Sequence, residues 1–200
     1  MFYLGKQNLG TLSQGFASHD YRKRGVLYTS AKELLCLFNI GDKVVYPMHG
    51  AGVIEGIEEM DVDGCSQTYY VMLIAMGNLR IKIAASKATD AGLRSVYSKD
   101  EVLECVRTAK CIGNGNVSNT GNWNQRYKDN LDRIRSGNLD EVASVFRSLL
   151  QRDQEKGLSS VEKKMMQNVR QIIISELVVA QNIKGCEAEK ILEETVLGQS

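Results

Sequence analysis

Between Phe38 and Ala84 the apolar positions follow the pattern of β-strands separated by tight turns. Pro47, the only proline, stops the first run because it has no N–H group to donate to a sheet. In the last run, alternation places Arg80 and Lys82 on one face and the aliphatic side chains on the other. The predicted strands are short and closely spaced, which is typical of a small, strongly bent sheet or barrel of the SH3 or Tudor kind. They fall near 43–46, 53–57, 68–74 and 79–83.

Helical signals begin after this sheet region. Ser98 and Glu101 fit a capping box, in which each side chain bonds a free backbone amide at the start of a helix. A short helix is therefore predicted from about Lys99 to Lys110. Residues 112–119 are rich in Gly, Asn and Ser, lack periodicity and predict a linker. The expected organisation is α+β: a β domain at 37–111, then the linker, then a helical domain at 120–200.

About four helices are predicted in the second domain. Gly137 ends the first, and the second begins at Asn138, a good capping residue, and runs to Gly157. A second capping box at 159–162 opens the third and longest helix, and a last short helix is predicted near 187–197. Short Gly-marked turns between helices predict a compact all-α domain. One face of its first helix is formed by Trp123, Tyr127, Leu131 and Ile134.

Residues 1–36 fit neither pattern, and we expect a non-native or disordered N-terminal extension. Regularly placed glycines interrupt any period, and there is no continuous apolar stretch of the kind that a signal peptide needs. An organellar transit peptide is one alternative, because the stretch contains a basic cluster at 21–24. Another is that translation begins at Leu37, decoded as methionine, because patterned sequence starts directly after it.

Charge and cysteine content narrow the class of protein. The formal net charge is only +1, so any nucleic-acid contact must come from a local patch. The five cysteines are scattered and the two histidines lie far apart, so no metal site is predicted. An odd cysteine count without a secretory signal indicates reduced thiols in the cytoplasm. No apolar run approaches the roughly 20 residues that span a bilayer, so no membrane contact is expected.

The sequence shows no recognisable catalytic motif. The sequence contains neither a P-loop nor the Gly-x-Ser-x-Gly and His-Glu-x-x-His patterns. Gly50-Ala51-Gly52 resembles the start of a dinucleotide fingerprint, but no helix is predicted after it, so a tight turn is favoured. The adjacent His49 has no nucleophile or acidic partner placed with it, which favours a structural histidine over a general base. We therefore expect no enzyme activity and no cofactor.

The single tryptophan, Trp123, has two interpretations. A lone tryptophan at helical spacing is ordinarily a core residue. However, Trp123 falls in the first turn of its helix, and Arg126 and Lys128 follow it closely. A flat ring beside cations suits stacking on nucleic-acid bases or insertion between them, and a helix N-terminus favours a phosphate. The residues alone leave both interpretations open.

Several blocks, taken together, resemble the CarD/CdnL family of bacterial transcription regulators, whose small N-terminal module also occurs in the transcription-repair coupling factor. The blocks keep the family's order and spacing from about Phe38 to Leu197. The first is Phe-Asn-Ile-Gly-Asp-Lys-Val-Val-Tyr-Pro-Met-His-Gly-Ala-Gly at 38–52, and Gly-Leu-Arg follows at 92–94. The later blocks are Asn-Trp-Asn-Gln-Arg-Tyr-Lys at 122–128, Arg-Asp-Gln-Glu-Lys-Gly-Leu-Ser at 152–159 and Glu-Lys-Lys-Met at 162–165.

The resemblance implies a function. In such proteins the Tudor-like barrel binds the β subunit of RNA polymerase, and the helical domain contacts promoter DNA at the upstream edge of the melted bubble. The family tryptophan, matched by Trp123, wedges into the minor groove and stabilises the open complex. The expected DNA-contacting residues are Trp123, Arg126, Lys128 and Lys163.

The polymerase contact is expected at Lys82, which matches a basic residue of the family's barrel, and at Arg80 on the same face. Met60 and Gln125 stand where some relatives carry arginine, so the charged part of each contact is expected to be weaker here. The chain is expected to act as a monomer. An alternative function is a protein-interaction adaptor that tethers another factor to the polymerase, with Trp123 buried and no direct DNA contact.

Overall fold

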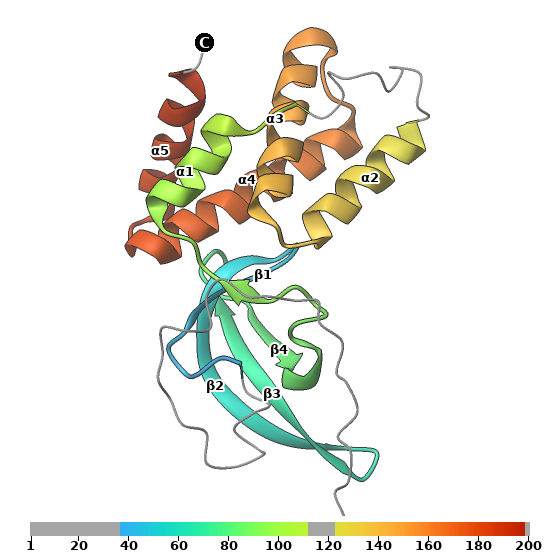
Figure 1. Ribbon diagram of the computed structural model, residues 1–200, viewed down its shortest axis with the longest axis vertical. Coiled ribbons are helices and arrows are strands. Elements are labelled where there is room, and N and C mark those ends of the chain that lie inside the picture. Colours follow the sequence, from blue (N-terminus) through green and yellow to red (C-terminus); the bar gives the residue numbers. More distant parts are fainter. Residues whose placement is uncertain (1–36, 112–122, 199–200) are drawn as a thin grey trace, which may run out of the picture. The chain divides into compact units, whose positions relative to one another are not determined.

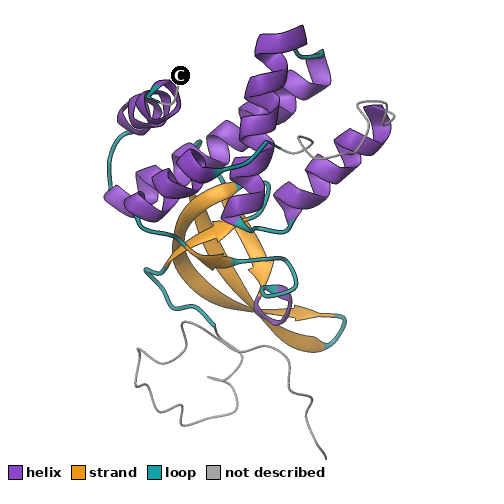
Figure 2. Cartoon of the chain, turned by 45° about the horizontal axis from the view of Figure 1, so that its top comes forward, coloured by secondary structure: helices purple, strands orange, loops and turns teal. Residues whose placement is uncertain are grey.

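The structure is a computed structural model that describes residues 37–111 and 123–198. The N-terminal extension (1–36) and the linker (112–119) expected from the sequence lie outside the described residues. All described residues belong to one compact unit. The fold is α+β, with a strongly curved antiparallel sheet followed by helices (Figures 1 and 2).

The sheet contains the predicted strands and one more. Its strand order is β4-β3-β2-β1-β5, and every pair is antiparallel. The added strand β5 is only two residues long, too short for a periodicity to reveal it. β4 and β5 are the two edges in the described part of the chain, so closure into the predicted barrel is not shown. The strands are β1 (Lys43–Tyr46), β2 (Gly50–Val62), β3 (Cys65–Ile74), β4 (Arg80–Ala84) and β5 (Arg94–Ser95).

Gly50 to Gly52 are the first residues of β2, so the tight turn predicted there lies just before them, at 47–49, and the chain continues as a strand and not as a helix. A β-carbon on Gly52 would lie 2.0 Å from the carbonyl oxygen of Leu73 on β3, so only glycine fits there. The sheet carries an apolar core around Tyr70, whose ring meets Phe38 edge-on with centroids 5.9 Å apart. The Tyr70 hydroxyl also accepts a hydrogen bond of 3.2 Å from the Phe38 N–H. These contacts fix the chain that enters β1 against the sheet.

Five helices follow, and their ends lie close to the predicted ones. Both capping boxes are present, at Ser98 with Glu101 and at Ser159 with Glu162, and Asn138 caps a third helix. The side chains of these caps accept hydrogen bonds from amides that the first helical turn leaves free. No described helix is long and apolar enough to cross a membrane. The helices are α1 (Lys99–Thr108), α2 (Trp123–Arg135), α3 (Leu139–Lys156), α4 (Ser160–Gln181) and α5 (Gly185–Leu197).

The helical core also includes α1, which precedes residues 120–200 in the sequence. Val102, Leu103 and Val106 of α1 are buried in the same apolar cluster as α3 and α4, so α1 packs with the helices that follow the linker. The 22-residue helix α4 also packs on β2 of the sheet. A small buried cluster of Val45, Ala51 and Val179 joins the sheet to that helix. Sheet and helices therefore share buried surface.

Candidate functional site

Helix α2 begins with the tryptophan. Trp123 is its first residue and 40% exposed, and its ring stacks on Tyr127 with centroids 5.7 Å apart and an interplanar angle of 16°. Tyr127 in turn packs against the helical core, together with Leu131 and the fully buried Ile134. The apolar face of α2 is thus buried progressively from its start to its end. The indole at the start of the helix is supported on one side and open to solvent.

The predicted cations lie on two helices. Lys128 is exposed on α2, and Arg126 is half-buried in the same helix. Lys163 and its neighbour Lys164 are exposed in the first turn of α4. Arg126 makes an interaction within the chain, so its guanidinium is not wholly free. Both helices pack on one core, which places the cations on the helical part of the molecule.

The residues of the block at 152–159 form the end of α3 and the turn into α4. Arg152 forms an ion pair with Glu162 at 2.9 Å, and Asp153 accepts a hydrogen bond of 3.1 Å from the Leu158 N–H. Gly157 has φ +74°, the left-handed conformation that favours glycine. Burial raises the pKa of the Glu162 carboxyl, but hydrogen bonds from Ser159 and the charge of Arg152 outweigh it and hold that pKa below its usual value. These contacts fix the helix turn that carries Lys163.

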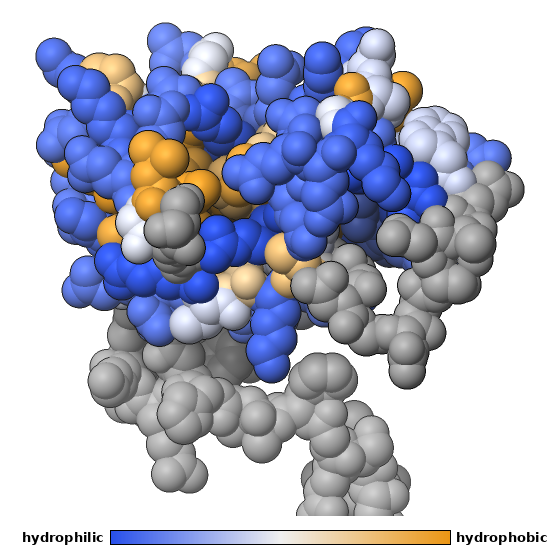
Figure 3. All heavy atoms as spheres, turned by 90° about the horizontal axis from the view of Figure 1, so that it is seen from above, coloured by the Kyte–Doolittle hydropathy of each residue, from blue (hydrophilic) through white to orange (hydrophobic). Residues whose placement is uncertain are grey.

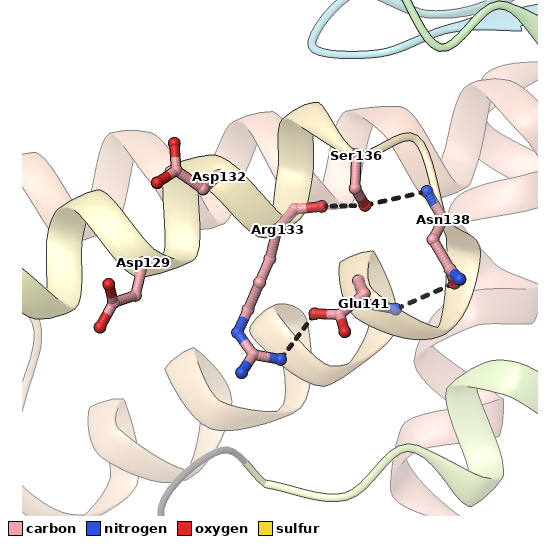
Figure 4. A pocket seen from close by; sticks show the side chains of 6 residues that line it. All are labelled: Asp129, Asp132, Arg133, Ser136, Asn138 and Glu141. Atoms are coloured by element: carbon pink, nitrogen blue, oxygen red, sulfur yellow. Dashed lines mark hydrogen bonds and ion pairs between the residues drawn. The ribbon is translucent and has the colours of Figure 1, made fainter.

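The surface beside the C-terminal half of α2 carries net negative charge, unlike the start of the helix, where Arg126 and Lys128 lie. A hollow of about 530 Å³ lies between α2 and α3, and three of its lining residues are carboxylates. Arg133 reaches across to Glu141 at 2.6 Å, and Asn138 uses its side chain to cap α3 (Figure 4). The hollow is therefore net acidic and does not suit a phosphate. Its lining residues are Asp129, Asp132, Arg133, Ser136, Asn138 and Glu141.

The helical surface seen from above is mostly hydrophilic, with scattered apolar patches (Figure 3). A second hollow of about 360 Å³ lies between α1 and α5 and is lined in part by Leu103 and Ile191. No cluster of potential metal ligands occurs in the residues that the structure describes.

The two residues predicted to contact the polymerase lie on edge strand β4. Arg80 and Lys82 are exposed and Ile83 is buried, which confirms the predicted alternation. Each cation meets a carboxylate of β2 two strands away: Arg80 Nε lies 2.8 Å from Glu55 Oε2, and Lys82 Nζ lies 2.7 Å from Glu58 Oε2. The hydrogen bond and charge of Glu55 raise the pKa of Arg80.

The sequence did not reveal that Glu55 and Glu58 pair with these cations. A β-bulge between Ile54 and Gly56 shifts the register of β2 against β3, and this shift determines where Glu55 and Glu58 lie. The available signal was the run of acidic residues in β2, but its register against β4 cannot be derived from periodicity alone.

The candidate sites on the helices and on β4 are both exposed surfaces. A protein with two such surfaces is suited to contacts with macromolecules. Residues 38–97 match the family described as the CarD-like/TRCF RID domain, and residues 107–193 match the CarD C-terminal domain. A protein of Bacillus subtilis (strain 168) named putative transcription factor YdeB is 39% identical over 155 residues, which cover 78% of this chain and 97% of that protein. The chain therefore belongs to the CarD-like family of transcription regulators.

Proposed function

We propose that this protein binds the β subunit of RNA polymerase through its sheet and stabilises the promoter open complex through α2. The family supports a transcription regulator that interacts with the polymerase. The observation that carries the DNA contact is Trp123, a partly exposed ring at a helix start. The proposed minor-groove contact uses Trp123 with Arg126, Lys128 and Lys163 at the upstream edge of the bubble.

The geometry of α2 suits a wedge. Stacking on Tyr127 limits the rotamers of the Trp123 indole, so little further ordering is needed when a base step receives it. Base–aromatic stacking contributes roughly 1–3 kcal/mol per contact. Melting exposes unstacked bases at the fork, so an inserted ring favours the melted state and shifts the equilibrium towards it without any chemistry. Lys128 and Lys163 would neutralise phosphates beside the wedge.

The polymerase contact is proposed at β4. An edge strand has free backbone donors and acceptors, to which a strand of the partner can pair. Arg80 and Lys82 flank that edge with exposed charged groups that can exchange their own carboxylates for those of the partner. Binding to the polymerase raises the local concentration of α2 at the promoter, so the affinity for free DNA can be low.

The lifetime of the open complex tests this function. We expect Trp123→Ala to shorten the lifetime of complexes formed with purified polymerase by about tenfold, corresponding to the loss of roughly 1.4 kcal/mol. Trp123→Phe keeps an aromatic ring, so its open-complex lifetime should fall between those of the parent and Trp123→Ala. Polymerase pull-down should be equal for all three proteins. An unchanged lifetime for Trp123→Ala with equal pull-down contradicts the wedge.

A further inference from the structure

One guanidinium connects the sheet to two parts of the helical core. Arg94 of β5 donates two parallel hydrogen bonds to Glu176 of α4, from Nη1 to Oε1 at 2.6 Å and from Nη2 to Oε2 at 2.9 Å. Its Nε donates to the carbonyl oxygen of Gly137 at 2.6 Å. Gly137 lies in the turn between α2 and α3, so the same side chain holds the sheet, α4 and the base of α2. The guanidinium also lies over the ring of Tyr97, with its central carbon 4.6 Å from the ring centroid.

The carboxylate that receives Arg94 is completely buried. The side chain of Glu176 is 0% exposed, and that of Arg94 is 19% exposed. Glu176 Oε1 also accepts a hydrogen bond of 3.0 Å from the Tyr97 N–H. A buried ion pair adds little net stability because desolvation offsets attraction, but its fork geometry defines one arrangement of the groups that it joins. A pair of this kind is suited to fixing the orientation of the elements that it joins.

The backbone around Arg94 is closely packed. A β-carbon on Gly137 would lie 2.9 Å from the carbonyl oxygen of Gly92 and 3.0 Å from the ring of Pro47. A β-carbon on Gly92 would lie 2.9 Å from the same ring, and both glycines have positive φ. Elsewhere on the junction, the Ser175 hydroxyl accepts a hydrogen bond of 2.8 Å from the Ala51 N–H. Hydrogen bonds and close backbone contacts at Gly92 and Gly137 therefore hold the turn before α3 against the sheet.

We infer that Arg94 and Glu176 are positioning residues, which set the orientation of the helical core, α2 included, relative to the proposed polymerase-binding sheet and thereby the place of Trp123. This inference rests on the proposed function. Arg94 acts at the C-terminal end of α2, and Trp123 is the first residue of that 13-residue helix. A helix of this length spans about 20 Å, so a tilt of about 10° at its base moves the far end by about 3 Å. A displacement of that size is comparable with the spacing of stacked bases and removes the wedge from its step.

The junction is tested first in the free protein, by the distance between two spin labels. Cys65 on β3 and Cys186 on α5 are exposed and lie on opposite sides of the junction. Cys36 and Cys111 would be replaced by serine, and Cys105 is labelled slowly because burial and Asp140 raise the pKa of its thiol to about 12. The double variant Arg94→Met/Glu176→Gln removes the charges and the bond to Gly137 without leaving a buried charge unpaired.

We expect the double variant to broaden the distance distribution while its far-UV circular dichroism stays that of the parent. Arg94→Lys keeps the charge but not the fork and should give an intermediate width. The matched control is Arg133→Met/Glu141→Gln, which removes a partly exposed ion pair of the same 2.6 Å length between α2 and α3 and should leave the distribution narrow. A distribution as narrow as the parent's in the Arg94→Met/Glu176→Gln protein overturns the inference, whatever the proposed function does.

The second measurement is the open-complex lifetime with the same variants. We expect Arg94→Met/Glu176→Gln to bind polymerase as the parent does and to shorten the lifetime as much as Trp123→Ala. If Trp123→Ala shortens the lifetime and the junction variant does not, positioning through Arg94 is wrong. If neither shortens it, the proposed function has failed, and the label distances alone then decide whether these residues fix the junction.

Discussion

The cations of β4 are balanced by carboxylates of their own chain. Lys82 and Glu58 are both about half exposed, so their ion pair contributes only about 0–1 kcal/mol to stability. A pair this weak can be exchanged for a partner's carboxylate at small cost. The pair orients the ammonium group on the exposed face and leaves Lys82 available for the proposed polymerase contact.

Charge reversal tests that contact. We expect Lys82→Glu to weaken binding to the polymerase by about tenfold, because it removes an attractive charge and adds one that repels Glu58 and the partner. The measurement is surface-immobilised binding at two salt concentrations, with a larger difference at low salt. Lys87→Glu, an exposed lysine outside β4, is the matched control and should bind normally. Equal binding of both variants and the parent would place the contact elsewhere.

Trp123 is the only tryptophan, so its fluorescence reports one site. With 40% of its surface exposed, we expect a red-shifted emission that acrylamide quenches readily in the free protein. Addition of polymerase and a promoter that forms an open complex should protect it from the quencher. A blue-shifted emission protected in the free protein would instead favour the adaptor function, in which the indole stays buried.

Among the elements, the turn from α3 to α4 has a stability that depends on pH. The pKa of Glu162 is below its usual value in the folded chain, so ionisation of this carboxyl favours folding. That contribution is fully present above the pKa of the unfolded chain and is lost as the pH falls through the lower folded pKa. We expect Glu162→Gln to lower the free energy of unfolding most at pH 7, and the difference from the parent to close below about pH 4.

Chemical denaturation at several pH values measures this difference. Ser159→Ala, which removes the reciprocal cap, should cost about 1 kcal/mol at pH 7. Ser98→Ala in the other capping box is the matched comparison, because Glu101 lacks a partner like Arg152 and is exposed. A Glu162→Gln effect that is the same at pH 7 and pH 3 would show that the loss comes from packing and not from charge.

Helix boundaries were predictable because their signals are local. Capping boxes, the Asn138 cap and the glycine stop at Gly137 placed helix ends within about two residues of the observed ones. The strand β5 was not predictable, because it exists only through pairing with β1, far away in the sequence. For the same reason the Gly92–Arg94 block could be matched to a family without revealing that Arg94 meets Glu176, 82 residues later.

Across the whole molecule, the sequence predicted two domains joined by a linker, and the described residues show buried surface between the sheet and the helices that the sequence did not reveal. Hydrophobic periodicity identifies the face that each element buries but not the element that it is buried against. Some of the positions at which the two parts meet carry small or polar side chains, such as Ala51 and Ser175, which periodicity does not distinguish from surface. The shared surface therefore became visible only in the structure.

Because the sheet and the helices share buried surface, we expect them to unfold together. Ser175 accepts a hydrogen bond from the buried Ala51 N–H, and Ser175→Ala leaves that amide without a partner, at a cost of about 1–3 kcal/mol. Because sheet and helices share this contact, we expect hydrogen exchange of slow amides in β3 and α3 to report the same loss in both. Ser66→Ala, an exposed serine of β3, should change neither by more than about 0.5 kcal/mol. A loss confined to β3 would mean that the sheet opens independently, and a polymerase-bound sheet could not then direct α2 through a fixed junction.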